Sequence, residues 1–156
     1  MRRTDREVTN PSEIQDIMSR CEVLHLAIHA QPAPYILPVN FGMEPDGMTL
    51  YIHGAMTGHK YDLLEQNRQV GFEMECTHGL VLDDGTHSCT MNYESVMGWG
   101  ILAELTGMEE KLHALDRIME HYHSGDFPYN RTVAERTRIL CLQIQERTAK
   151  RREKKL

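Results

Sequence analysis

The stretch Leu50-Tyr-Ile-His-Gly-Ala-Met-Thr-Gly-His-Lys60 joins the end of a strand to a glycine-containing loop. Apolar side chains at Met48, Leu50 and Ile52 alternate with Thr, Tyr and His, which is typical of a strand with one buried face. His53 then falls on the polar face, at the last position before the loop. The pattern therefore predicts that His53, at the end of the strand, lies beside any ligand that the loop binds.

The loop after this strand has the composition of an anion site. Gly54, Ala55 and Gly58 are small enough to bring the backbone close to a ligand, and a short helix is predicted to begin at Lys60. Free N–H groups at a helix start, with His59 and Lys60 beside them, can hold a phosphate. Neither G-x-x-x-x-G-K-[ST] nor G-x-G-x-x-G is present, so P-loop and Rossmann sites are not predicted.

The remaining pattern predicts a small antiparallel barrel of about six strands, with three helices packed outside. The first helix has a capping signature at Asn10-Pro-Ser-Glu13, the second spans 60–66, and the third starts with a capping box at Thr106-Gly-Met-Glu109. Residues 77–90 have no period and are interpreted as an irregular excursion. The predicted strands cover residues 23–28, 35–42, 48–53, 70–76, 93–105 and 140–145.

Two of these strands contain residues that weaken ordinary sheet pairing. Pro38 cannot donate to a ladder, so its strand is predicted to lie at an edge or a bulge. Gly98 and Gly100 predict strong bending or close backbone approach in the strand that follows the excursion.

Length and composition predict one globular domain, residues 1–146, followed by a basic tail, residues 147–156. The chain has 156 residues, 40% of them hydrophobic, and no apolar run near the ~20 residues that span a bilayer. The charged amino terminus is not followed by an apolar region, so we expect a cytoplasmic protein without a membrane segment. The four cysteines are far apart and are interpreted as reduced packing thiols.

Charge argues against nucleic acid as a partner. Residues 147–155 carry six Lys or Arg against one Glu, so the rest of the chain has a net charge of −11 against −6 for the whole. Phosphate contacts dominate nucleic-acid affinity, and an acidic body opposes them. The basic tail is interpreted as a frayed, solvated terminus.

A metal site is a further alternative. Cys76-x-His78 and His87-x-Cys89 flank the excursion and could close a Cys₂His₂ set. The C-x-H spacing is not usual for zinc, and Cys76 continues an apolar strand face. No metal is therefore predicted.

Four stretches together resemble the nitroimidazole-reductase (Nim) family, which belongs to the FMN-binding split β-barrel superfamily of pyridoxamine 5′-phosphate oxidase. Each motif is common, but their order and spacing are specific, and the match covers roughly the first 105 residues. The stretches are Arg2-Arg3-x-Asp5-Arg6, Pro38-Val39-Asn40-Phe41-Gly42, Tyr51-Ile52-His53-Gly54-Ala55 with Gly58-x-Lys60, and Tyr93-x-Ser95-Val96-Met97-Gly98-x-Gly100.

The resemblance implies a mainly β (α+β) fold, a six-stranded antiparallel split β-barrel with flanking helices. It also implies a homodimer with two FMN molecules in clefts between the subunits. Lys60 and His59 would hold the phosphate, Ser95 would contact the same end of the cofactor, and His53 would lie next to the flavin ring as the catalytic residue. The full set of implied cofactor-binding residues is Pro38, Val39, Asn40, His53, Gly54, Ala55, Gly58, His59, Lys60 and Ser95.

The function implied is that of an FMN-dependent oxidoreductase that takes electrons from a nicotinamide donor and reduces a nitroaromatic or quinone acceptor. The flavin carries the difficult chemistry, and a histidine can move a proton near neutral pH. The alternative is a flavin- or haem-binding carrier without turnover. Pyridoxamine phosphate oxidases carry an Arg-x-His pair near the carboxyl terminus, which the stretch 147–156 lacks, so vitamin B6 oxidation is not expected.

Overall fold

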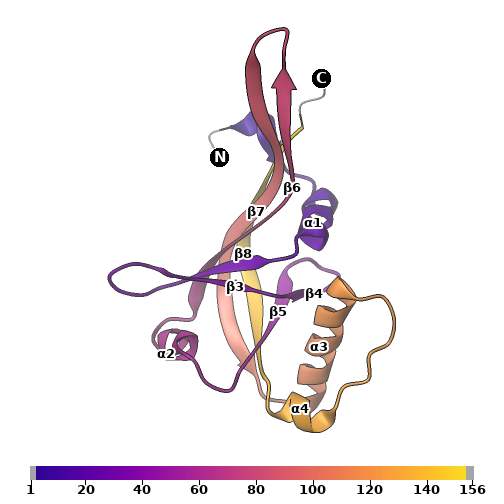
Figure 1. Cartoon of the computed structure of the whole chain (residues 1–156). Coiled ribbons are helices and arrows are strands. Elements are labelled where there is room, and N and C mark those ends of the chain that lie inside the picture. Colours follow the sequence, from indigo (N-terminus) through magenta and orange to yellow (C-terminus); the bar gives the residue numbers. More distant parts are fainter. Residues whose placement is uncertain (1–2, 154–156) are drawn as a thin grey trace.

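The computed structural model describes residues 3–153, which form one strongly curved antiparallel sheet with helices on its outside (Figure 1). The strands follow the order β3-β2-β6-β7-β8-β5-β4, and β1 pairs with β8 beside this path. The strands are β1 (Glu7–Val8), β2 (Leu24–Ile28), β3 (Tyr35–Val39), β4 (Gly42–Met43), β5 (Thr49–Gly54), β6 (Gln69–Asp83), β7 (Ser88–Leu105) and β8 (Arg138–Arg152). The helices are α1 (Pro11–Arg20), α2 (His59–Gln66), α3 (Met108–Tyr122) and α4 (Arg131–Glu135), after a 3₁₀ turn, η1 (Thr4–Arg6).

The predicted fold class is confirmed. Each of the six predicted strands coincides with one of the longer strands, while β1 and β4 have two residues each and are too short to show alternation. The edge position predicted for Pro38 is also correct, because β3 is the first strand of the sheet. A Cβ at Gly98 would overlap the carbonyl oxygen of Glu146, so this glycine lets β7 approach β8 closely, as predicted.

The interpretation of residues 77–90 as an excursion is wrong. β6 and β7 pair on through Asp83 and Ser88, with a register shift between Cys76 and Gly79, and extend beyond the body as a long hairpin (Figure 1). Both faces of this hairpin lie away from the core, and Leu80 and Leu82 are exposed. No buried face imposes apolar alternation there, so the sequence carries no strand signal.

The interpretation of the basic tail as a frayed terminus is also wrong for residues 147–152. These residues continue β8 and pair with β7 and β1, and only Lys154–Leu156 of the predicted tail lie outside the described residues. Two of their four basic side chains have partners: Arg147 donates to the carbonyl of Gly47, and Arg151 donates to Glu94 and Glu13. The domain therefore extends past residue 146.

The capping box of α3 is shifted by one residue from its predicted position. Gly107 is the N-cap, and its N–H donates to Oε2 of Glu110 at 3.3 Å. The predicted pair, Thr106 and Glu109, has the same spacing one residue earlier. The sequence cannot distinguish the two registers, because two glutamates follow one another.

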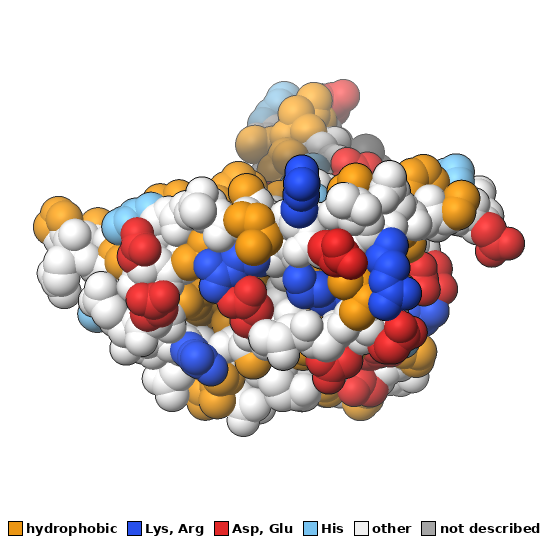
Figure 2. All heavy atoms as spheres, turned by 90° about the horizontal axis from the view of Figure 1, so that it is seen from below, with side chains coloured by type: hydrophobic (Ala, Val, Ile, Leu, Met, Phe, Trp, Pro, Cys, Tyr) orange, Lys and Arg blue, Asp and Glu red, His pale blue; other side chains and the backbone are white. Residues whose placement is uncertain are grey.

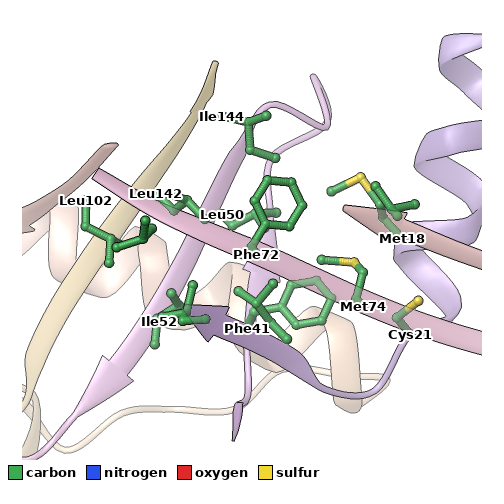
Figure 3. Close-up of a cluster of buried hydrophobic side chains, with 14 of the residues drawn as sticks. Met18, Cys21, Phe41, Leu50, Ile52, Phe72, Met74, Leu102, Leu142 and Ile144 are labelled. Atoms are coloured by element: carbon green, nitrogen blue, oxygen red, sulfur yellow. The ribbon is translucent and has the colours of Figure 1, made fainter. Parts of the chain in front are cut away.

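The core fills the space between the curved sheet and α1 (Figure 3). β5 and β8 contribute alternate residues from the opposite wall, and Met18 of α1 enters from the side. Phe41, which follows the edge strand, is fully buried among them. The side chains at its centre include Met18, Cys21, Phe41, Leu50, Ile52, Met74, Leu142 and Ile144.

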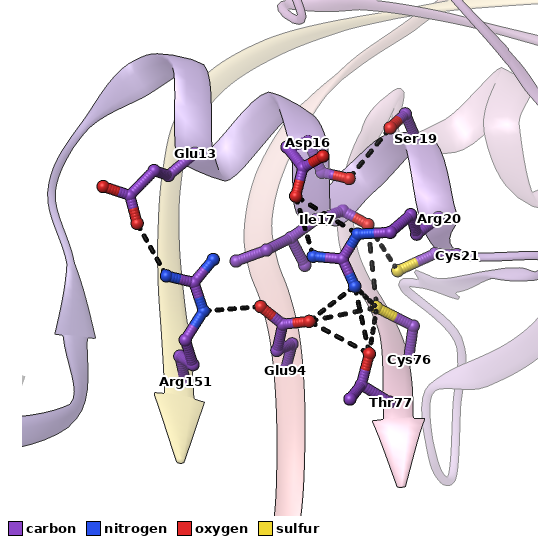
Figure 4. Close-up of polar contacts among 10 residues, drawn as sticks. All are labelled: Glu13, Asp16, Ile17, Ser19, Arg20, Cys21, Cys76, Thr77, Glu94 and Arg151. Carbon is purple, nitrogen blue, oxygen red and sulfur yellow. Dashed lines mark hydrogen bonds and ion pairs between the residues drawn. The ribbon is translucent and has the colours of Figure 1, made fainter. Parts of the chain in front are cut away.

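A buried carboxylate ties α1 to three strands at one end of this core (Figure 4). Glu94 of β7 is 7% exposed and accepts hydrogen bonds from Arg20 of α1 at 2.5 Å, Arg151 of β8 at 2.6 Å and Thr77 of β6 at 3.0 Å. The hydrogen bond from Arg20 lowers the pKa of Glu94 to about 2, against the opposing effect of burial, and Arg151 lowers it further. A charged Glu94 is therefore required for the arrangement in Figure 4.

Replacing Glu94 should change how the free energy of unfolding depends on pH. The folded-state pKa of about 2 lies below the ordinary value of 4.5, so the stabilisation is present above pH 4.5 and is lost as pH falls towards 2. Glu94→Gln should lower the free energy of unfolding by about 3 kcal/mol at pH 7 and flatten its pH dependence in this window. Urea unfolding at a series of pH values measures both.

The matched control is Glu13→Gln, which removes the more exposed partner of the same arginine, Arg151. An exposed ion pair contributes about 0–1 kcal/mol, so this variant should change little. Equal pH dependence in Glu94→Gln and the parent protein would contradict the role of Glu94.

Candidate functional site

The loop between β5 and α2 leaves the start of the helix open. Gly58 is the N-cap, with φ of 153°, a conformation that favours glycine, and it has no side chain to cap the helix. The backbone N–H of Tyr61 donates a hydrogen bond to the carbonyl of Gly58, with an N···O distance of 3.0 Å. The N–H groups of His59 and Lys60 precede the first turn and lack intrahelical acceptors. The helix start is therefore available to an anion, as the sequence predicts.

Two cations meet at one aromatic ring beside this helix start. Lys60 Nζ lies 5.0 Å from the centroid of the Tyr61 ring, and Cζ of Arg138 lies 3.8 Å from the same centroid. Burial lowers the pKa of Lys60, and the nearby charge of Arg138 lowers it further. Two like charges held close together favour the binding of an anion, because an anion relieves their repulsion.

Other side chains hold this arrangement in place. Arg138 donates from Nε to Glu104 Oε1 at 2.9 Å and makes a second contact with the same carboxylate, so its orientation is fixed. The Tyr61 hydroxyl donates to the carbonyl of Ala55 at 2.7 Å and ties the loop to α2. Among the described residues no carboxylate pairs with Lys60, so Lys60 is the cation left for a ligand.

Arg138, Tyr61 and Glu104 are absent from the set derived from the sequence. Arg138 begins β8 and Glu104 lies near the end of β7, and neither carries a local motif. Only the pairing of β5 with β8, which sets Gly54 opposite Arg138, brings them to the loop. The predicted charge pattern could not reveal them.

The face of the molecule seen in Figure 2 carries both signs of charge. Lys and Arg side chains lie interspersed with Asp and Glu there, and no broad basic area is present on this face. This mixture suits a small anion better than an extended polyanion.

His53 lies on the other side of β5 from Lys60. Leu50 and Ile52 are buried in the core, whereas His53 is exposed and faces α3 and α4. A Cβ at Gly54, the next residue, would meet the Tyr61 hydroxyl and Lys60 Nζ. Successive side chains of a strand point to opposite faces, so one residue of β5 separates the two environments.

Pro38 and Val39 lie on the edge strand β3, and Pro38 lines a hollow together with Val23, His25 and Glu75. Pro38 pairs with His25 of β2, which pairs with Glu73 of β6, so these residues form one row across the sheet. Asn40 follows β3 and lines a separate hollow with Tyr122 at the end of α3. Of the cofactor-binding residues that the resemblance implies, Pro38 and Val39 therefore lie on one edge of the sheet, and Asn40 lies just beyond the end of that strand.

A separate, broad groove of about 670 Å³ lies on the sheet face turned away from the core. Ile36, Met97 and Trp99 contribute exposed apolar side chains to it, with 67%, 40% and 40% of their surface accessible. Nδ1 of His25 lies 3.5 Å from Glu73 Oε2. Burial, and then the neighbouring Glu75, raises the pKa of Glu73 to about 7.

Ser95 is not brought to Lys60 within one chain. Ser95 pairs with Glu75 and Lys150, while Leu105, ten residues further along β7, pairs with Ile139 opposite His53. Ten residues of strand span roughly 33 Å. Ser95 and Lys60 therefore lie towards opposite ends of β7.

The described residues contain no group of three or more His, Cys, Asp or Glu side chains placed to hold a metal ion. No helix within this part of the chain is both long and apolar enough to cross a membrane.

The family model described as pyridoxamine 5′-phosphate oxidase matches residues 10–151. The chain belongs to this family. A candidate 5-nitroimidazole antibiotic resistance protein from Bacteroides thetaiotaomicron has a similar solved structure, with 30% identity over 92% of this chain and 85% of that one, and a TM-score of 0.83. Within the pyridoxamine 5′-phosphate oxidase family the chain is thus Nim-like, as the sequence motifs indicate.

Two other members of this fold group are solved flavin- or haem-related proteins with lower identity. The flavocytochrome Anf3 from Azotobacter vinelandii shares 21% identity, covers 99% of this chain and 72% of its own, and has a TM-score of 0.82. The FAD and haem binding protein from Mycobacterium smegmatis shares 19% identity, covers 96% and 74%, and also has a TM-score of 0.82. At these identities they show a common fold. A search among curated proteins gave no match.

Proposed function

We propose that the protein is an FMN-binding oxidoreductase that accepts electrons from a nicotinamide donor and reduces a small aromatic acceptor of the nitroaromatic or quinone type. The observation that carries this proposal is the meeting of Lys60 and Arg138 at the open start of α2, in a chain of the pyridoxamine 5′-phosphate oxidase family. Membership of the family and its Nim-like group supports a flavin as the ligand.

The residues of the loop fit a phosphomonoester. Lys60 is a part-buried cation without a carboxylate partner among the described residues. Burial and the charge of Arg138 lower the pKa of Lys60, and a bound anion would oppose both effects. His59 and Lys60 supply N–H groups, and Gly58 permits the tight turn before them. In this proposal Gly54 and Ala55 carry the chain past the phosphate end, and the edge strand from Pro38 to Asn40 supports the ring.

Bound FMN would supply the redox chemistry, while the protein supplies orientation and protons. His53 is the residue that we assign to proton delivery, because its side chain is exposed on β5, lines a pocket, and has no hydrogen bond with the described residues. Its neighbour Gly54 lies against Lys60, so the strand sets the proton donor at a constant separation from the anion site.

The proposed FMN site needs two copies of the chain. Ser95 lies towards the opposite end of β7 from Lys60 within one chain. The exposed apolar side chains of Ile36, Met97 and Trp99 line the broad groove on the outer face of the sheet. Burial of such a surface against a second copy is favourable, and a two-fold arrangement would bring Ser95 of one copy towards Lys60 of the other.

We therefore expect a dimer, with a mass twice the 18.0 kDa of one chain, by light scattering at micromolar concentration. Trp99→Lys should shift the protein towards the monomer, because it sets a charge in the apolar groove. Phe127→Lys, at an exposed apolar residue outside the groove, should not. A monomeric parent protein would contradict an FMN site shared between subunits.

Lys60→Ala should weaken FMN binding without unfolding the protein. A hydrogen bond to a charged group contributes about 1.5–3 kcal/mol, so the affinity should fall about tenfold to a hundredfold. Fluorescence titration measures it, and circular dichroism checks the fold. Arg68→Ala is the matched control, because Arg68 is an exposed cation beyond the opposite end of α2. Unchanged affinity in Lys60→Ala would exclude the proposed phosphate site.

His53→Ala should separate chemistry from binding. The phosphate contacts lie on the other face of β5, so most FMN affinity should remain. If His53 delivers a proton, acceptor reduction should slow by about 10²- to 10⁴-fold. Stopped-flow absorbance after mixing pre-reduced holoprotein with a nitroaromatic or quinone measures this rate. His87→Ala, at the far end of the hairpin, is the control, and equal rates in all three proteins would leave His53 without a catalytic role.

The second candidate function is a flavin- or haem-binding carrier without turnover. It is supported by the flavocytochrome and by the FAD and haem binding protein of the same fold. The visible spectrum of the purified protein distinguishes the cofactors, since a flavin gives two bands in the blue and near ultraviolet and haem gives a Soret band. Turnover with a nicotinamide donor then distinguishes an enzyme from a carrier.

A further inference from the structure

A second pocket, of about 420 Å³, lies between β5, α3 and α4 and takes no part in the anion site. Its wall is mainly aliphatic and aromatic: Leu115, Ile118 and Met119 come from α3, and Phe127 and Tyr129 come from the segment between the helices. The rings of Phe127 and Tyr129 meet edge to face, with centroids 5.5 Å apart. Such a wall accommodates a flat apolar ligand.

Most polar atoms in this wall already have partners. The Tyr129 hydroxyl donates to the carbonyl of Leu115 at 2.6 Å, and the Thr137 hydroxyl donates to the carbonyl of Val133 at 2.9 Å. The side-chain oxygen of Asn130 accepts from a backbone N–H of α4. The imidazole of His53 and the amide NH₂ of Asn130 are the side-chain groups left for a ligand, and both can donate a hydrogen bond.

These properties specify the ligand. An apolar cavity of about 150 Å³ holds benzene, so this pocket has room for one substituted ring or two fused rings. Two free donors in an apolar wall select an oxygen acceptor at one edge of the ligand, such as that of a nitro or carbonyl group. Charged ligands are disfavoured, because the wall offers no ionic partner other than the imidazole.

We propose that this pocket binds a one- or two-ring aromatic molecule through an oxygen acceptor held by His53, and that it is the acceptor subsite of the oxidoreductase. The second part rests on the proposed function. The placement supports it, because His53 forms part of the pocket wall while the next residue, Gly54, lies against Lys60 and Tyr61 in the anion site. One residue of β5 therefore connects the two.

The decisive variant is Val133→Trp. Val133 is 61% exposed on α4 at the mouth of the pocket, so an indole there can fill the opening without entering the core. Val133→Thr, of nearly the same shape, is the control. The probes are nitrobenzene and ethylbenzene, and amide chemical shifts follow their binding to the flavin-free and the FMN-loaded protein.

Nitrobenzene should shift the amides of α4 and His53 in a saturable way, and Val133→Trp should weaken its binding at least tenfold while Val133→Thr does not. His53→Ala should weaken nitrobenzene about two- to tenfold, the size of one neutral hydrogen bond, and leave ethylbenzene unchanged. Absence of saturable shifts at these residues, or equal binding to Val133→Trp, would overturn the pocket.

The test separates this inference from the proposed function. Binding to the flavin-free protein that Val133→Trp removes would support the pocket even if FMN did not bind. Normal FMN affinity and normal acceptor reduction in Val133→Trp would overturn the subsite while leaving the oxidoreductase intact.

Discussion

The buried carboxylate of Glu94 is the interaction on which the architecture depends. α1 packs on the core of the sheet through Ile14, Ile17 and Met18, and it is also attached to the sheet at its last turn. Arg20, in that turn, donates to Glu94, and Arg151 of β8 donates to the other oxygen of the same carboxylate. One charge on β7 thus joins a helix and two neighbouring strands. Without it, the guanidinium groups of Arg20 and Arg151 would lose the carboxylate that they share.

An ion pair of the same type serves a different purpose at the other end of β7. Glu104 holds Arg138 at the start of β8, and Arg138 then lies over Tyr61 beside Lys60. At the Glu94 end each arginine is paired with carboxylates, whereas at this end Lys60 has no carboxylate partner among the described residues. We therefore interpret the Glu94 ion pairs as structural and the surroundings of Lys60 as the candidate anion site.

β5 is the element that brings the chemistry together. Its alternation directs Leu50 and Ile52 into the core and His53 towards α3 and α4, and the strand ends in the glycine loop that opens α2. In a helix, successive side chains differ in direction by about 100°, so they do not point to opposite faces as they do in a strand. The anion site and the apolar pocket are therefore neighbours in sequence and remain distinct in space.

Local sequence determined much of this protein. Alternation at Leu50 and Ile52 predicted β5, Gly58 predicted the open helix start, and Pro38 predicted the edge strand, because each depends on a backbone property of one or two residues. The long hairpin carried no such signal, since neither of its faces is buried. The basic stretch after residue 146 was misread because the fold, and not the residues, provides its partners.

Tertiary structure alone decided where distant charges meet. Arg138 reaches Tyr61 through the pairing of β5 with β8, and Glu94 binds Arg20 through the docking of α1. It also decided that Ser95 and Lys60 lie far apart within one chain. Such contacts depend on strand register and helix docking, which the whole core sets, whereas composition and periodicity report only on a residue's own neighbourhood.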